Sequence, residues 1–311
     1  MDAILSPAFV TALLLGAVTA GTPLLLAGLG EQIAEKAGVL NIGIEGMMLM
    51  GAYVGFVAAF TTGSFWMGFA GGAAGGVAVA VLMSILCVRL GMNQIVIGIA
   101  LTLGAEGLTA LLHHFQFSRS YPRLPDVPVL EIPGLAAIPV IGPVLFAHHP
   151  LVYLAVGLVV LLGWLFRRTN MGLNLEAAGQ KPGALDAAGV GVIATRTWAV
   201  LTTGALAGIG GAFMATVGAG LFVPFMTGGA GFIGIVLAML ARGRPLWVML
   251  GALLFGISLA LTTAFQVAGF NIPTDVVHML PFAMVIVVLV LFARHSVLPP
   301  ALGLPYVRSD R

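Results

Sequence analysis

Residues 37–56, AGVLNIGIEGMMLMGAYVGF, place Asn41 and Glu45 inside an otherwise apolar stretch. Residues four apart share one face of an α-helix, so the sequence predicts a polar stripe made by these two side chains. A carboxylate at membrane depth is costly, and such groups normally face the interior of a helix bundle or a watery cavity. Two interpretations stand level: the stripe lines a solute pathway, or it forms a hydrogen bond that locks two helices together.

Glycines in the same stretch bear on this choice. Gly38, Gly43 and Gly46 would permit a broken helix here. Irregular backbone at membrane depth is tolerated only beside protein or a cavity. This favours the pathway slightly, with Asn41, Gly43, Glu45 and Gly46 as candidate lining residues.

A second carboxylate, Glu106, lies in the apolar stretch LTLGAEGLTALL. It could form a hydrogen bond with a substrate or with a neighbouring helix. We therefore add Glu106 to the candidate pathway residues.

The elements that position these groups follow from composition, which is 60% hydrophobic and only 8% charged. Apolar runs recur along the whole chain and are long enough to cross a hydrocarbon core of about 30 Å. They lack the alternation of a membrane β-barrel. The sequence predicts an all-α, polytopic transmembrane bundle of about nine spans, forming one domain over residues 1–311. The expected spans lie near 8–29, 38–60, 66–88, 94–114, 151–166, 197–219, 222–241, 245–267 and 276–293.

The distribution of basic residues predicts the orientation of these spans. Of 13 lysines and arginines, only Arg119 and Arg123 fall on one side of the alternating loops. Because cytoplasmic loops are enriched in lysine and arginine, the opposite side is expected to be cytoplasmic. The N-terminus then lies outside and the C-terminus inside.

Two loops differ from short connections. Residues 115–150 are expected outside the cell and are rich in proline yet apolar, so we expect them to pack against the outer face. Residues 167–196 are expected in the cytoplasm and contain two short helical segments broken at Pro182. Helices shorter than about 12–15 residues are marginal alone, so this segment either docks on another protein or is an ordinary tethering loop.

Several kinds of chemistry are not expected of this chain. Neither Lys36 nor Lys181 lies in a GxxxxGK[ST] motif, so any ATP hydrolysis is assigned to another subunit. No GxSxG or HExxH motif is present. The chain is expected not to be an enzyme, and no metal, cofactor or nucleic-acid partner is expected.

Several motifs resemble those of one transporter family. GEQIAEKAGVLNIGIEGMMLMGAYVGF is similar to the signature of bacterial ABC-importer permeases of the branched-chain amino acid, ribose and nucleoside superfamily, closest to the simple-sugar and nucleoside branch. The resemblance continues through MNQIVIGIALTLGAEGLTALL, EAAGQKPGALDAAGVGVIATRTWAV, GFIGIVLAMLARGRPLWVMLGALLFG and NIPTDVVHMLPF. It covers most of the chain in order.

The resemblance implies a role for the cytoplasmic loop. The family's coupling helix, which sits in a groove of the ATPase subunit, corresponds to residues 176–190. The residues assigned to it are Glu176, Gly179, Lys181, Pro182, Ala184, Ala187 and Gly189.

The resemblance also implies an importer in the bacterial cytoplasmic (inner) membrane. Its partners would be ABC ATPase subunits, a second permease subunit, expected to be a different chain, and an extracellular or periplasmic solute-binding protein. A nucleoside or simple sugar is the expected solute, with a flavin-like or purine-like compound as the alternative. Glu106 replaces a residue that is often apolar in the family, so nucleoside specificity is not carried over directly. A proton-coupled secondary transporter using Glu45 and Glu106 is the rival hypothesis.

Overall fold

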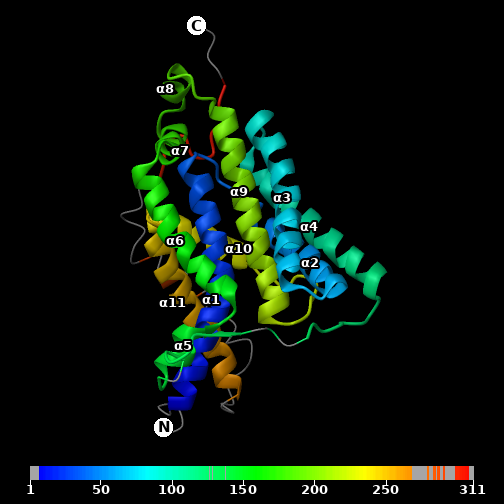
Figure 1. The fold of residues 1–311 in the computed structure, drawn as a ribbon. Coiled ribbons are helices and arrows are strands. Elements are labelled where there is room, and N and C mark those ends of the chain that lie inside the picture. Colours follow the sequence, from blue (N-terminus) through cyan, green and yellow to red (C-terminus); the bar gives the residue numbers. More distant parts are fainter. Residues whose placement is uncertain are drawn as a thin grey trace.

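The computed structural model describes residues 7–125, 127, 129–136, 138–267, 279, 283–284, 286–287, 290 and 298–307. The described residues are mostly helical, as expected, and the long helices run side by side in one bundle (Figure 1). The elements are α1 (Pro7–Lys36), α2 (Ile44–Thr62), α3 (Phe65–Met83), η1 (Ser84–Arg89), α4 (Gln94–Phe117), β1 (Leu130–Glu131), α5 (Ile141–Phe146), β2 (Ala147–His148), α6 (Pro150–Arg168), α7 (Asn170–Gln180), α8 (Pro182–Ala187), α9 (Val192–Phe213), η2 (Met214–Gly218), α10 (Ala230–Ala241) and α11 (Pro245–Val267).

The long helices lie where the apolar runs predicted them. Among the described residues, six helical stretches are long and apolar enough to cross a membrane, and two shorter apolar helices accompany them. Each expected span before residue 276 coincides with a helix at least in part. The last expected span, 276–293, lies mostly outside the described residues.

The prediction that Asn41 and Glu45 share one face of a helix is wrong. α1 continues to Lys36, residues 37–43 form an irregular connection, and α2 begins only at Ile44. Gly38 adopts a φ of +84°, a left-handed conformation that glycine accepts without steric cost. Asn41 therefore precedes the helix, and Glu45 lies in its first turn.

The span expected at 222–241 is helical only in its second half. α10 begins at Ala230, and an irregular segment connects it to the end of η2. Gly228 and Gly229 have positive φ values of 51° and 89°, which interrupt the helix directly before α10. α10 is consequently a short helix whose N-terminus lies inside the bundle.

Small residues build the centre of the bundle. α9 packs against α1, α2 and α3. Gly72 and Gly76 of α3 meet Gly204 and Gly208 of α9 so closely that a Cβ at Gly76 or Gly208 would overlap the opposite backbone. The small-residue patterns in these two stretches therefore pack against one another, as close-packed membrane helices require.

The two ends of the bundle carry different segments. α5 lies near the start of α1, whereas α7 and α8 lie at the opposite end (Figure 1). The loop over 115–150 packs against the bundle through α5, which contacts α1. Within the loop, a short antiparallel pair places Leu130 opposite His148. Residues 298–307 lie beside α7, where Ala301 N–H donates to the Gly179 carbonyl at 3.0 Å.

Candidate functional site

The connection between α1 and α2 is held by side chains of other elements. Asn41 is fully buried, and its backbone N–H donates to Glu31 Oε1 at 3.0 Å. Leu40 N–H donates to Gln94 Oε1, at the start of α4, at 2.8 Å. Asn41 Nδ2 lies 3.3 Å from Met47 Sδ, a weak interaction, and Asn41 Oδ1 has no partner among the described residues. The connection is thus fixed mainly through its backbone.

Glu45, in the first turn of α2, contacts the N-terminus of α10. Its Oε1 accepts hydrogen bonds from Thr227 Oγ1 at 2.6 Å and from Gly229 N–H at 2.9 Å, while Oε2 accepts from Gly231 N–H at 2.7 Å. Glu45 is only 3% exposed, so water contributes little to its solvation. A carboxylate with three donors at a helix N-terminus replaces that solvation with charge-assisted bonds and a favourable helix dipole.

The sequence explains why this contact can form. Gly229 caps α10 without a side chain, so the first N–H groups of the helix need an acceptor from elsewhere. Gly231 packs so tightly against Glu45 that a Cβ there would lie 2.7 Å from the Glu45 Cα and N atoms. Glycine at these positions lets the start of α10 sit directly on the first turn of α2.

The neighbouring glycines pack α2 against α4. A Cβ at Gly46 would lie 3.0 Å from the Leu101 carbonyl oxygen, and a Cβ at Gly98 would lie 2.8 Å from Gly43 N. Gly43 and Gly46 are both buried. Four of the five predicted pathway residues are therefore brought together, in the protein interior of this chain.

Glu106 is not part of that group. It is half-buried on α4, on the same face as Ile99 and Leu103, which are 47% and 62% exposed. No hydrogen bond or ion pair joins its carboxylate to another described residue. Glu106 thus lies on the outward, apolar side of α4. It is apart from Glu45 and its partners Thr227, Gly229 and Gly231, which we call the Glu45 cluster.

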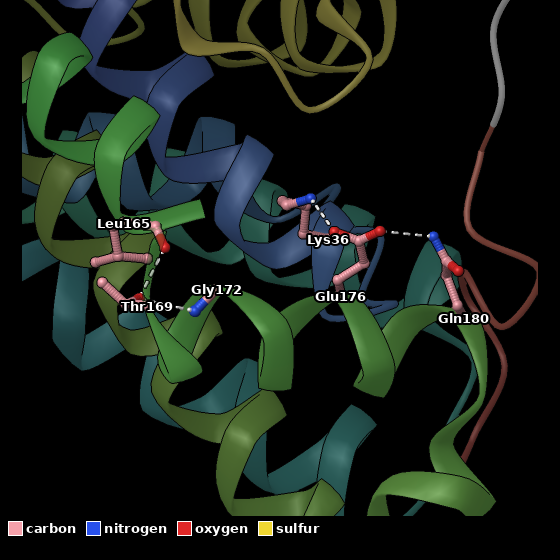
Figure 2. A network of polar contacts seen from close by, with 6 residues as sticks. All are labelled: Lys36, Leu165, Thr169, Gly172, Glu176 and Gln180. Carbon is pink, nitrogen blue, oxygen red and sulfur yellow. Dashed lines mark hydrogen bonds and ion pairs between the residues drawn. The ribbon is translucent and has the colours of Figure 1, made fainter. Parts of the chain in front are cut away.

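α7 is capped at its start and tied to α1 further along. Figure 2 shows Thr169 accepting from Gly172 N–H at 3.2 Å and donating to the Leu165 carbonyl at 2.7 Å. Lys36, the last residue of α1, forms an ion pair with Glu176 at 3.1 Å, and Gln180 Nε2 donates to the other Glu176 oxygen at the same distance (Figure 2). The predicted loop therefore consists of two helices packed on the bundle.

The break expected at Pro182 is confirmed, because α7 ends at Gln180 and α8 begins at Pro182. Lys181 joins the two helices and is exposed, and Gly189 ends the turn after α8 with a φ of +83°. α8 is anchored by buried Leu185, which packs in a cluster with Ala178 and Val192. Its outward residues, Ala184 and Ala187, are exposed at the end of the molecule.

Comparison with known proteins assigns the chain to a family. Residues 13–289 match the family described as "Branched-chain amino acid transport system / permease component". The chain belongs to this permease family. It is the permease component of an ABC transporter, and the family match favours this over the proton-coupled alternative.

Individual relatives cover nearly the same length as this permease. TsgC13 of Haloferax volcanii, provisionally named a glucose ABC transporter permease, is 41% identical over 80% of this chain and 76% of its own. NupC of Lactococcus lactis subsp. cremoris, named a nucleoside ABC transporter permease, is 32% identical over 93% of this chain and 94% of its own.

A solved structure supports the fold of the permease. It is described as an inward-facing conformation of an ABC transporter provisionally assigned to the metal-chelate type, with a TM-score of 0.53 and 17% identity. The match covers 90% of the permease and 84% of that chain. At this identity the likeness concerns the fold alone.

Sequence reasoning missed several residues of the permease that the structure places at these two sites. Thr227 and Gly231 bind Glu45, and Arg196 is buried against the segment that carries α7. Glu31 and Glu35 are also buried near the end of α1. A signal was present in the four-residue spacing of Glu31 and Glu35, which places both carboxylates on one face of a helix directly before a glycine break.

Proposed function

We propose that the permease carries a nucleoside or a simple sugar into the cell, driven by ATPase subunits that bind α7 and α8. The relatives named for glucose and nucleosides support this solute class. The importer would lie in the bacterial cytoplasmic membrane with about nine crossings, the N-terminus of the chain outside and the C-terminus inside. A solute-binding protein would deliver the solute from the outer side.

The observation that carries this proposal is the construction of α8. A helix of six residues has little stability of its own, yet Leu185 anchors it in a buried cluster while small side chains face outward. The exposed side chains of Ala184 and Ala187 are small, so a groove of another protein could close over them. Residues Glu176, Gly179, Lys181, Pro182 and Gly189 hold or shape this docking segment, which we define as residues 176–190.

A second permease subunit, a different chain, would complete the solute pathway on the outward side of α4. The carboxylate of Glu106 lies among exposed apolar residues of that face. A carboxylate facing lipid is unfavourable, whereas one facing a protein interface or a watery path is not. Glu106 would therefore touch the solute or the partner permease.

The Glu45 cluster would form the wall behind this pathway. Both Glu45 oxygens bind the start of α10, and Gly43 and Gly46 hold α2 against α4. In this part of the chain, Asn41 Oδ1 is an acceptor that has no hydrogen-bond partner among the described residues.

The charge of the expected solute follows from the cations near the pathway. Arg196, which lies inside the α9 span, already donates to backbone carbonyls. A neutral solute suits such a pathway better than an anion, which would need a free cation.

Ala184→Asp tests the docking segment. A carboxylate buried in an interface without a partner would weaken ATPase binding by at least about tenfold, since that needs only about 1.4 kcal/mol. The measurement is the amount of ATPase that copurifies with the permease, together with ATP-driven uptake. Ser120→Asp adds the same charge at an exposed position in the loop after α4, and should leave both quantities unchanged. Normal copurification and uptake with Ala184→Asp would refute the docking surface.

A further inference from the structure

One buried arginine gathers three separate segments at the end of the bundle that carries α7. Arg196, in the second turn of α9, is only 2% exposed. Its Nε donates to the Ala37 carbonyl at 3.0 Å, and its Nη1 donates to the Leu304 carbonyl at 2.7 Å. Its Nη2 donates to the Ala178 carbonyl at 3.1 Å and lies 3.5 Å from the Ala301 carbonyl. One guanidinium group thus bonds to the α1–α2 connection, to α7 and to residues 298–307.

The same segments also contact one another directly. Gly303 N–H donates to the Gly38 carbonyl at 3.1 Å. Gly179 of α7 packs on the Lys36 carbonyl so closely that a Cβ would overlap it. Together with the Ala301–Gly179 bond described above, these contacts form one closely packed junction around Arg196. These contacts place the start of the α1–α2 connection directly beside α7, and Arg196 is the side chain that bonds to both.

The α1–α2 connection leads directly to the Glu45 cluster. Only residues 39–43 separate Gly38 from the first turn of α2. Ile44 N–H, which opens that turn, donates to the Asn41 carbonyl at 3.1 Å. Glu45 then contacts the N-terminus of α10 through three hydrogen bonds. A continuous series of short contacts therefore runs from the docking segment to α10.

We propose that Arg196 is a positioning residue that transmits movement of the docking segment to residues 37–43 and so to the contact between Glu45 and α10. This inference rests on the proposed function, because it requires an ATPase that moves the docking segment. The planar guanidinium suits the role, since its donors point in several fixed directions at once. Lysine keeps the charge but cannot bind these carbonyls in the same fixed arrangement.

The test compares amide hydrogen exchange in the complete transporter with and without a non-hydrolysable ATP analogue. In the unmodified permease, exchange should change both in residues 176–190 and in residues 37–43. In Arg196→Gln, the change in residues 176–190 should remain and the change in residues 37–43 should be lost. Solute uptake per ATP hydrolysed should fall by about tenfold, within the usual range of coupling between sites.

The control is Arg89→Gln, the same substitution at an exposed arginine that ends η1. It should preserve both exchange responses and uptake. If Arg196→Gln does not yield folded protein, Arg196→Lys is used, and it should give a partial loss of the response in residues 37–43 with retained ATPase binding.

Two results would overturn the inference while leaving the proposed function intact. One is an Arg196 variant that keeps the exchange response in residues 37–43 and the uptake of the unmodified permease. The other is an unmodified permease whose residues 176–190 respond while residues 37–43 do not. Absence of any response in residues 176–190 of the unmodified permease would instead refute the proposed function, and the inference with it.

Discussion

The Glu45 cluster and the Arg196 junction are both built around a buried charge, but they connect different things. Glu45 accepts three hydrogen bonds, all from residues 227–231 at the start of one helix. Arg196 donates to carbonyls of three segments that are far apart in the sequence. The first joins two helices inside the bundle. The Arg196 junction joins the bundle to α7 and to residues 298–307.

This difference bears on how each charge is stabilised. The helix N-terminus supplies N–H groups that would otherwise lack acceptors, so one carboxylate and one helix end satisfy each other. The carbonyls around Arg196 lie at the ends of helices and in connections, where acceptors are in excess. We expect loss of Glu45 to damage the fold and loss of Arg196 to damage coupling.

The largest effect is expected for Glu45→Leu. It would leave three donors without an acceptor. At about 1–3 kcal/mol for each, the free energy of unfolding should fall by about 3–9 kcal/mol. The measurement is reversible unfolding in mixed micelles, with the yield of monodisperse protein. Glu106→Leu is the matched control, because the carboxylate of Glu106 forms no hydrogen bond or ion pair with another described residue. Equal stability of the two variants would contradict the bracing role of Glu45.

A smaller effect is expected for Thr227→Val, which removes one of the three donors to Glu45. The bond from Thr227 Oγ1 is 2.6 Å long and buried. We expect a loss of about 1.5–3 kcal/mol, the usual contribution of a hydrogen bond to a charged group. Thr202→Val serves as control, because Thr202 is exposed and its hydroxyl, among the residues that the structure describes, bonds only within its own helix. A loss no larger than that of the control would show that Glu45 does not need this donor.

The smallest effect is expected at the ion pair that supplements the Arg196 junction. The side chain of Glu176 is 45% exposed and that of Lys36 is 16% exposed, so solvent screens their attraction. A double-mutant cycle with Lys36→Met and Glu176→Gln should give a coupling free energy of about 0.2–1 kcal/mol, reduced by added salt. A salt-independent coupling well above that range would mean that this pair, rather than Arg196, dominates the junction.

Part of this organisation could be read from the sequence. The long apolar runs predicted the helices, and Pro182 predicted the break between α7 and α8. The position of Asn41 could not be predicted reliably, because Gly38 permits either a helix or a left-handed turn and only tertiary contacts select one. The partners of Glu45 lie more than 180 residues away and are largely backbone amides. Those of Arg196 are backbone carbonyls, which any residue type supplies, so no side-chain pattern indicated them.

Uptake into proteoliposomes tests most directly whether an ATPase drives this permease through α7 and α8. Vesicles would contain the permease and its partner permease, with the binding protein outside and a panel of labelled nucleosides and sugars. Accumulation against a gradient should occur only when the ATPase and ATP are present, and Ala184→Asp should abolish it. Uphill accumulation without the ATPase, driven by an imposed proton gradient, would contradict the proposed mechanism.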